Sequence, residues 1–355
     1  MKREFASPAL ETSLAIPSTE DHLSRCTKGM AEVLEQLRRL GGKPIEDLTP
    51  EQARQQPGPA DAVAALMKKR GQSANPEPVA QMENRRIPGP GGDIAIRIYT
   101  PLGTGPFPVV LYIHGGGWVL ADLDAYDASP RALCNATGAV VVSAHYRLAP
   151  EHPFPASHDD TFAAYLWVRA NATSFHGDPT RVAVAGESAG GNMAAAISLM
   201  ARDRKVPLPV HQVLVYPVAG VDLDTASFKE HAHAKPLNRA MMVWFGAHEF
   251  SLPADVHDPR IDLLHTNLAG MPPTTLITAE IDPLRSGGEL LASQLKAAGV
   301  SVEAKQYVGV THEFFGMGSV LEESRDAVQF AARNLRKAFE RDVGVPTSAK
   351  DRKEP

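Results

Sequence analysis

The chain has 355 residues, with 36 basic and 41 acidic side chains, so its formal net charge at pH 7 is −5. Apolar residues make up 43 % and charged residues 22 %, close to the average of soluble globular proteins, which excludes intrinsic disorder of the whole chain. The mildly acidic balance argues against nucleic acid or an anionic membrane surface as the main partner. The length fits one large domain or two smaller ones.

The sequence also gives indications of the cellular compartment in which the protein resides. The two cysteines, Cys26 and Cys134, cannot form a disulfide framework, and no metal-ligand spacing accompanies them. The N-terminus contains Glu4, Glu11 and Glu20 and lacks the continuous apolar segment of a secretory signal. No apolar run approaches the roughly 18 residues that span a bilayer. We therefore expect a cytoplasmic protein without stable membrane insertion.

The first 80 residues are expected to be helical. Apolar side chains at helical spacing indicate a first helix: Met30, Val33, Leu34, Leu37 and Leu40. A second helix is expected to begin at Thr49, because Thr49 can act as N-cap, Pro50 occupies the first helical position and Gln52 completes a capping box. A third is expected at 60–67. Residues 1–80 are predicted to form an N-terminal helical cap segment.

From about residue 82 short apolar runs alternate with helical stretches. The predicted strands are 94–99, 109–113, 139–144, 181–185, 211–216, 274–278 and 302–307. The predicted helices are 130–136, 155–169, 190–204, 286–298 and 323–341. Strands rich in Val, Ile and Leu are typical of a sheet buried on both faces, and alternation with helices implies parallel crossovers. We predict an α/β fold at 81–342, with a mostly parallel central sheet and helices on both faces.

One stretch interrupts this alternation. Residues 217–273 contain no convincing strand but include an apolar helix at 238–250. We expect this helical insertion to join the N-terminal helices in a helical cap above the carboxyl edge of the sheet. The last residues, 343–355, are expected to be a flexible tail.

A G-x-S-x-G motif follows the predicted strand at 181–185. Gly186, Ser188 and Gly190 fit a sharp strand-to-helix turn that exposes the Ser188 hydroxyl at the sheet edge. The helix that begins at Ala189 adds free N–H groups and the positive end of its dipole, which favour a developing oxyanion. The motif alone is moderately specific, and its place between a buried strand and an alanine-rich helix strengthens it.

Three consecutive glycines follow the strand at 109–113. Gly115, Gly116 and Gly117 lower backbone stability and add no side-chain packing, so a purely structural role explains them poorly. They would let backbone N–H groups approach a substrate oxyanion at about 3 Å. A phosphate-binding loop is the competing interpretation, but neither G-x-x-x-x-G-K-[ST] nor G-x-G-x-x-G is present here.

Taken in order, HGGGW at 114–118, YRLAPE at 146–151 and GESAGG at 186–191 resemble the hormone-sensitive-lipase-like branch of the α/β-hydrolases, which comprises bacterial carboxylesterases and relatives. The resemblance continues through MPP at 271–273, AEIDPLR at 279–285 and THEF at 311–314, and covers roughly residues 85–340. Two positions depart from the family pattern. Glu187 stands where aspartate is commoner, and Glu313 stands where glycine usually follows the histidine; neither removes a catalytic group.

The chain order Ser…Asp/Glu…His of this fold assigns a catalytic triad of Ser188, Asp282 and His312. Both partners of the serine follow predicted strands, where open α/β sheets place their ligands. Glu280 is the alternative acid, closer to the buried strand. The expected oxyanion donors are the N–H groups of Gly116, Gly117 and Ala189. Four residues are expected to support the motifs: His114, which would shape the glycine loop, with Gly115, Trp118 and Glu187.

The resemblance and the residues together predict a serine carboxylesterase acting on short- to medium-chain esters, with a small-molecule ester as its partner. No metal and no organic cofactor is expected. Amide, lactone or acetylated substrates remain alternatives with the same triad, and a non-catalytic small-molecule receptor is a further one. Candidate pocket walls, for which ordinary packing is an equal alternative, are Trp118, Trp244, Phe245 and Phe315. The oligomeric state, a homodimer included, is left open.

Overall fold

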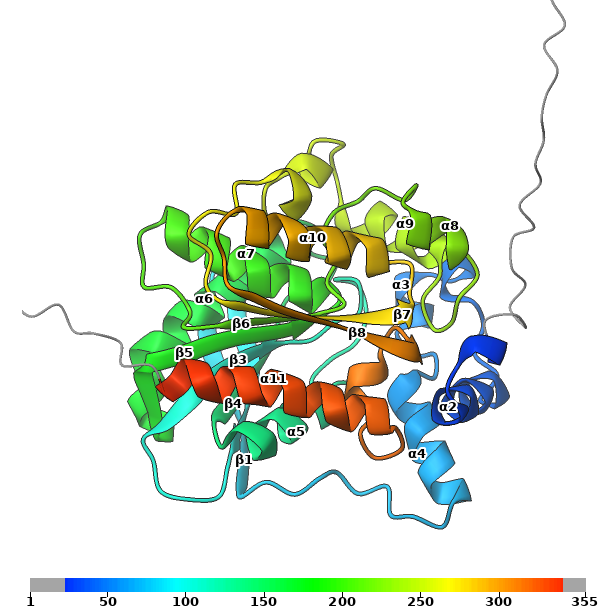
Figure 1. Cartoon of the computed structure of the whole chain (residues 1–355), viewed down its shortest axis with the longest axis horizontal. Coiled ribbons are helices and arrows are strands. Elements are labelled where there is room, and N and C mark those ends of the chain that lie inside the picture. The colour runs from blue at the N-terminus through cyan, green and yellow to red at the C-terminus, as the bar shows by residue number, and fades with distance from the viewer. Residues whose placement is uncertain (1–22, 341–355) are drawn as a thin grey trace, which may run out of the picture.

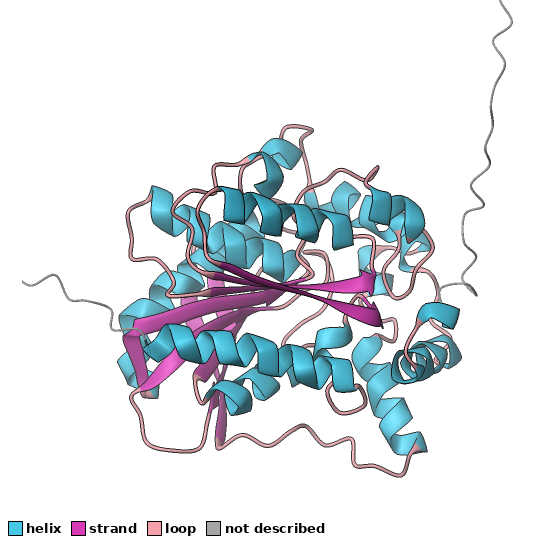
Figure 2. Cartoon of the chain, viewed as in Figure 1, coloured by secondary structure: helices cyan, strands magenta, loops and turns pink. Residues whose placement is uncertain are grey.

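The computed structural model describes residues 23–340, so the expectations for residues 1–22 and for the tail at 343–355 lie outside the described residues. The chain forms one eight-stranded sheet between two helical layers (Figures 1 and 2). Its strand order is β1-β2-β4-β3-β5-β6-β7-β8. The pairs β1·β2 and β2·β4 are antiparallel, and all neighbours from β4 to β8 are parallel.

The strands are β1 (Gln81–Gly89), β2 (Gly92–Thr100), β3 (Phe107–Ile113), β4 (Val140–His145), β5 (Gly177–Glu187), β6 (Gln212–Val215), β7 (Thr274–Ile281) and β8 (Val302–Thr311). All seven predicted strands form. The sequence did not indicate β1, because this edge strand is mostly polar and exposed and pairs with β2 in a hairpin.

The helices are α2 (Lys28–Arg39), α3 (Pro50–Ala53), α4 (Pro59–Lys69), α5 (Ala128–Thr137), α6 (Ala156–Asn171), α7 (Ala189–Asp203), α8 (Ala226–Glu230), α9 (Arg239–Glu249), α10 (Arg285–Ala297) and α11 (Glu322–Glu340). Short 3-10 turns are η1 (Ile45–Asp47), η2 (Ala172–Phe175), η3 (Asp255–His257), η4 (Leu263–His265) and η5 (Phe314–Gly316). Helices α6, α7 and α10 cover one face of the sheet, and α5 and α11 cover the other (Figure 1).

Successive residues of the central strands point to opposite faces and fill two separate cores. In β3, Val109 and Leu111 pack toward the side of α6 and α7, while Val110 and Tyr112 pack toward α5 and α11. All four side chains are fully or almost fully buried. Burial of each apolar side chain contributes roughly 1.5–3 kcal/mol, so the parallel centre of the sheet is a rigid base for the turns at its carboxyl edge.

The N-terminal helices lie beyond the ends of β7 and β8 (Figure 1). Helix α2 buries Met30, Val33 and Leu34, as its spacing predicts. The expected second helix is a single turn, α3, which begins with the predicted capping box of Thr49 and Gln52. It ends early because Pro57 and Gly58 follow within a few residues.

The insertion at 217–273 contains α8 and α9 and contacts the N-terminal segment between α2 and α3. Asn238 caps α9 by accepting a hydrogen bond from the Met241 N–H at 2.8 Å, and its amide donates to Glu46 at 3.1 Å. Trp244 Nε1 donates to the Leu48 carbonyl at 3.0 Å. Between Leu23 and Glu340, no helix has both the length and the apolar character needed to cross a membrane.

Candidate active site

Ser188 lies between the end of β5 and the first residue of α7. Its φ of +57° and ψ of −120° are unusual for a residue with a side chain and are maintained by the surrounding backbone. The Ser188 N–H donates to the Val215 carbonyl at 2.9 Å, and the Ser188 carbonyl accepts from the Val218 N–H at 3.2 Å. The strained turn predicted by the G-x-S-x-G motif is therefore present.

Gly190 brings this turn against the end of β3. A Cβ built on Gly190 would lie 2.1 Å from the Ile113 carbonyl oxygen, a backbone atom that cannot move aside. Only glycine allows this approach, which places the start of α7 beside the loop that begins at His114. The two glycine motifs of the sequence are thus neighbours in the fold.

Asp282 and His312 meet because of the register of β7 and β8. These strands are parallel, and their last residues, Ile281 and Thr311, are paired with each other. The residues that follow them, Asp282 and His312, therefore lie next to each other, and Asp282 Oδ2 is 2.7 Å from His312 Nδ1. The second oxygen, Oδ1, accepts from the Leu284 N–H at 2.8 Å. Asp282 is fully buried and His312 is 3 % exposed.

Glu280, the alternative acid, contacts other groups. Its Oε2 accepts from the Gly309 N–H at 2.8 Å, and its Oε1 pairs with Arg25 at 2.9 Å. It therefore stabilises β8 and the N-terminal segment, and no hydrogen bond joins it to His312 among those of the described residues.

The pKa of His312 lies above its ordinary value. Burial alone would lower the pKa, but the charge and the hydrogen bond of Asp282, followed by the charges of Glu313 and Glu187, more than offset this. The ring of Tyr216 packs on the imidazole, with centroids 4.4 Å apart. Within residues 23–340, no hydrogen bond joins His312 to Ser188; such bonds are often long in proteins without substrate.

The glycine loop follows β3 and is fixed by two aromatic residues. His114 Nδ1 donates to the Gly115 carbonyl at 2.8 Å, and the Tyr146 hydroxyl donates to the same carbonyl at 3.0 Å. Burial, with the nearby His145, lowers the pKa of His114 to about 3, so the imidazole is neutral. With its proton on Nδ1, His114 accepts from His145 at Nε2, 3.1 Å away. His114 therefore contacts the loop through the Gly115 carbonyl.

Helix α9 of the insertion packs directly on this loop. A Cβ on Gly117 would lie 2.3 Å from the ring of Phe245, and Trp118 is buried with its ring centroid 5.9 Å from that of Phe250. Phe245 thus borders the loop, whereas the Trp244 ring packs against Phe245 and His248 of the same helix. Phe315, another candidate wall, instead packs in the core under α11.

Glu187 is completely buried behind Ser188. The hydroxyl groups of Tyr112 and Tyr216 both donate to its carboxylate. Burial, with the nearby charge of Glu313, raises the pKa of Glu187 to about 7. The sequence marked Glu187 and Glu313 as departures from the family pattern and Glu187 as a supporting residue, but the tyrosines Tyr112 and Tyr216 were not identified from it. The position of Tyr216, directly after a buried strand, is the one signal that could have identified it.

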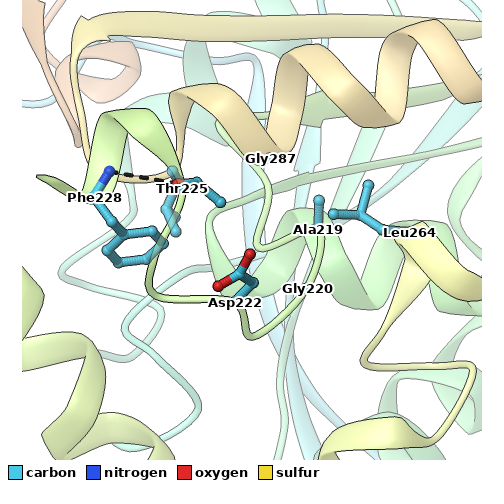
Figure 3. Close-up of a pocket in the computed structure, with 8 residues that line it drawn as sticks. Ala219, Gly220, Asp222, Thr225, Phe228, Leu264 and Gly287 are labelled. Atoms are coloured by element: carbon cyan, nitrogen blue, oxygen red, sulfur yellow. Dashed lines mark hydrogen bonds between the residues drawn. The ribbon is translucent and has the colours of Figure 1, made fainter. Parts of the chain in front are cut away.

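A small cavity lies beside the Asp282 turn (Figure 3). It measures about 20 Å³ and is lined by Ala219, Gly220, Phe228 and Leu284, among others. A space of this size holds about one water molecule, so it is too small for an ester substrate.

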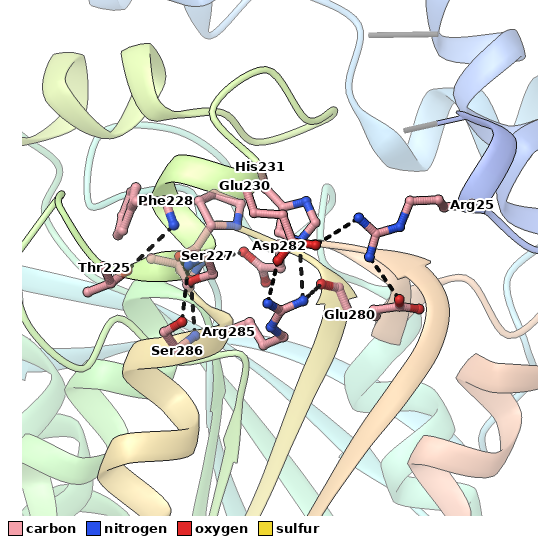
Figure 4. Close-up of polar contacts among 12 residues, drawn as sticks. Arg25, Thr225, Ser227, Phe228, Glu230, His231, Glu280, Asp282, Arg285 and Ser286 are labelled. Carbon is pink, nitrogen blue, oxygen red and sulfur yellow. Dashed lines mark hydrogen bonds and ion pairs between the residues drawn. The ribbon is translucent and has the colours of Figure 1, made fainter. Parts of the chain in front are cut away.

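A polar network next to this cavity joins three segments of the chain (Figure 4). Arg25 pairs with Glu230 of α8 at 2.8 Å and with Glu280 of β7 at 2.9 Å. Arg285, at the start of α10, pairs with the other oxygen of Glu230 at 2.6 Å. The network ties the N-terminal segment and the insertion to the turn that carries Asp282.

The described residues offer no obvious metal centre. From Leu23 to Glu340, no group of three or more His, Cys, Asp or Glu side chains is arranged to hold a metal ion. The polar groups at the sheet edge are a hydroxyl, an imidazole, a carboxylate and the backbone N–H groups of the adjoining turns, which is the set used in nucleophilic acyl transfer.

Comparison with known proteins gives consistent matches. Residues 110–316 match a protein family described as alpha/beta hydrolase fold. Carboxylesterase NlhH of Mycobacterium tuberculosis is 40 % identical over 273 residues, which cover 74 % of this chain and 84 % of that protein. An ethyl acetate hydrolase of Pseudomonas putida is 31 % identical over 304 residues, covering 84 % and 93 %. A hyperthermophilic esterase of the archaeon Pyrobaculum calidifontis superposes with a TM-score of 0.81 at 38 % identity, covering 88 % of this chain and 98 % of its own.

Proposed function

Since the chain belongs to the alpha/beta hydrolase fold family, in its hormone-sensitive-lipase-like branch, we propose that it hydrolyses short- to medium-chain carboxylic esters through an acyl-enzyme on Ser188. The predicted fold and family are confirmed by these matches. Several relatives are named as carboxylesterases or esterases, so the protein is a carboxylic ester hydrolase.

In the proposed mechanism Ser188 is the nucleophile and His312 is the base. Ser188 Oγ attacks the ester carbonyl carbon while its proton moves to His312 Nε2, and His312 then returns the proton to the leaving alcohol oxygen. Asp282 holds the Nδ1–H tautomer and stabilises the imidazolium that forms. Water deacylates the enzyme by the same route. The 2.7 Å contact between Asp282 and His312 and the burial of both support these roles.

The negative charge of the tetrahedral intermediate would be stabilised by the N–H groups of Gly116, Gly117 and Ala189. Gly116 and Gly117 have φ angles of +96° and +58°, and Ala189 begins α7 directly after the nucleophile. Loss of one such donor typically costs about 3 kcal/mol of transition-state stabilisation. The support for this oxyanion hole is the close approach of α7 to the end of β3, which brings the two sets of donors together.

We further propose that residues 1–80 and the insertion at 217–273 act as a cap on the catalytic domain at 81–342. The contact of Phe245 with the glycine loop supports this division, as does the bond from Trp244 to Leu48. Arg54 of the N-terminal segment also donates to the carbonyls of Val119 and Ala149, next to that loop. A cytoplasmic location remains a prediction from the sequence, which leaves the oligomeric state open.

One observation carries the proposal: the register that pairs Ile281 with Thr311 sets Asp282 against His312 at the edge where the strained Ser188 turn lies. The test is hydrolysis of p-nitrophenyl esters of increasing acyl length by the purified protein. We expect turnover that is highest for short to medium chains, and a loss of about 1,000-fold or more in kcat for Ser188→Ala.

A matched control is Ser198→Ala, the same substitution within α7. Ser198 Oγ donates only to the Ala194 carbonyl of its own helix, so this variant should keep its activity. Equal turnover by wild type and Ser188→Ala would contradict the nucleophile assignment.

A further inference from the structure

Glu313 follows His312 directly and has a backbone conformation that usually belongs to glycine. Its φ is +70°, in the left-handed region that disfavours residues with a Cβ. Glycine would relieve this strain. A glutamate at this position therefore needs contacts that glycine cannot make.

The Glu313 side chain makes two such contacts. Its Oε1 accepts a hydrogen bond from the Tyr126 hydroxyl at 2.6 Å and lies 3.9 Å from His312 Nε2. On the other side of the same ring, Asp282 Oδ2 is 2.7 Å from Nδ1. His312 thus lies between two carboxylates, and Glu313 is at the nitrogen that exchanges its proton with Ser188 in the proposed mechanism.

Tyr126 fixes the Glu313 carboxylate against the glycine loop. The Tyr126 and His114 rings are 5.8 Å apart, and a Cβ on Gly115 would lie 2.4 Å from the Tyr126 hydroxyl. The Glu313 side chain is 19 % exposed, so water screens its charge only partly. A chain of contacts therefore runs from the glycine loop through Tyr126 and Glu313 to His312.

The other titratable groups around this pair are acids and tyrosines. They are Asp282 after β7, Glu187 at the end of β5, Tyr112 of β3, Tyr126 before α5 and Tyr216 after β6. Burial raises the pKa of Glu313, and the His312 charge and the Tyr126 hydrogen bond offset this only in part. Across residues 23–340, no lysine or arginine is among the groups that act on Glu313, so His312 is its cationic partner.

We propose that Glu313 is a positioning residue: its carboxylate stabilises the protonated form of His312 at Nε2 and so raises the pH at which His312 becomes a base for Ser188. Glu313 itself takes no proton, since the proton still moves from Ser188 Oγ to His312 Nε2 and then to the leaving oxygen. The same carboxylate stabilises the imidazolium formed during the attack, so the maximal rate also depends on it. The inference rests on the proposed function.

The test is the pH dependence of kcat/KM for p-nitrophenyl butyrate from about pH 5 to about pH 9.5. An opposite charge within about 4–6 Å shifts such a titration by about one pH unit or more, so in Glu313→Gln the rate at about pH 6, relative to that at about pH 8.5, should rise roughly five- to tenfold. The maximal kcat should fall by roughly three- to tenfold.

A matched control is Glu303→Gln, which removes the same charge from the far end of β8. Glu303 is exposed and lies about 30 Å along the chain from Glu313, at about 3.3 Å per residue. This distance exceeds the screening length of about 10 Å at moderate salt, so the pH profile and kcat should match those of wild type.

Two further variants separate charge from structure. Glu313→Gly removes the carboxylate and relieves the backbone, so its Tm should not fall although its pH profile moves as in Glu313→Gln. Tyr126→Phe removes the hydrogen bond that keeps Glu313 ionised. The rise of kcat/KM with pH should therefore shift toward lower pH, but by less than in Glu313→Gln.

The outcomes are distinct. Suppose that wild type hydrolyses the ester and that kcat/KM rises over the same pH range in wild type, Glu313→Gln and Glu313→Gly. The inference is then overturned, and the proposed function stands. If wild type does not hydrolyse esters, the proposed function is overturned and the inference with it.

Discussion

The turns that carry Ser188, Asp282 and His312 differ from helices α2 to α4 in what holds them in place. Each turn directly follows a strand of the buried parallel sheet, and all three side chains are less than a tenth exposed. Helices α2 to α4 pack beside the core through buried apolar side chains such as Met30 and Leu66. The residues next to these helices are joined to the rest by the ion pairs of Arg25 and Arg54, which are partly exposed.

This difference shows which part of the molecule fixes the reacting groups and which part can vary without loss of activity. Strand register fixes the reacting groups to within a hydrogen-bond length, because slipping β7 against β8 would disrupt the buried core as well. Partly exposed ion pairs contribute about 1 kcal/mol or less each, so these links to the N-terminal segment can change at little cost. Changes at the strand ends should therefore abolish activity, while changes in the N-terminal helices should adjust it.

The largest effect at the strand ends, apart from loss of the nucleophile, is expected for Asp282→Asn. An amide at this position leaves His312 in the wrong tautomer, so kcat should fall by roughly 1,000- to 10,000-fold while the fold is kept. The measurement is steady-state hydrolysis of p-nitrophenyl butyrate, with circular dichroism to check folding.

Glu280→Gln is the matched control for Asp282→Asn, because Glu280 lies in the same strand end but contacts Arg25 and Gly309. Its kcat should fall less than about tenfold, since only a partly exposed ion pair and one hydrogen bond to the backbone are weakened. A larger loss in Glu280→Gln than in Asp282→Asn would reverse the assignment of the acid.

A smaller effect is expected for Gly116→Ala in the glycine loop. Its φ is +96°, and the new Cβ would lie 2.3 Å from the Leu120 carbonyl oxygen, so the loop must shift. Displacing one oxyanion donor should lower kcat by roughly 100- to 1,000-fold. Gly138→Ala is the control, because Gly138 has a φ of +69° but no atom within 4 Å of the new Cβ. It should lower Tm slightly and leave kcat unchanged; a similar kcat in both variants would refute the role of the loop.

The smallest effect is expected in the N-terminal segment, for Arg25→Ala. This change removes two ion pairs that join the segment to α8 and β7 (Figure 4). Since the Arg25 side chain is 37 % exposed, we expect Tm to fall by no more than about 4 °C and kcat/KM to change less than about fivefold. Arg38→Ala, which breaks a pair within α2 only, should change neither activity nor substrate preference. If Arg25→Ala lowered kcat as much as Asp282→Asn does, the two regions would not differ as described.

The sheet and the positions of the reacting residues could be predicted from the sequence because local patterns encode them. Apolar runs such as the one in β3 mark buried strands, and the glycines around Ser188 mark a turn that other residues cannot form. The pairing of Asp282 with His312 could be expected from chain order, since each follows a parallel strand.

Other parts of the site could not be predicted, because they depend on contacts between distant segments. Tyr126 reaches Glu313 across 187 positions of the sequence, and Tyr216 contacts both Glu187 and His312. Strand β1 escaped notice for a different reason: an exposed edge strand needs no alternating apolar pattern. The shortness of α3 could not be predicted either, since a capping box marks where a helix begins but not how far it continues.

The most direct test of the central claim is covalent labelling with a fluorophosphonate, followed by mass spectrometry of the digested protein. Attack by an activated serine forms a stable bond to phosphorus and releases fluoride, so one adduct per chain is expected, on the peptide that contains Ser188. Ser188→Ala should remain unlabelled. An adduct on another residue, or an unlabelled wild-type protein that still hydrolyses esters, would contradict the assignment of Ser188 as the nucleophile.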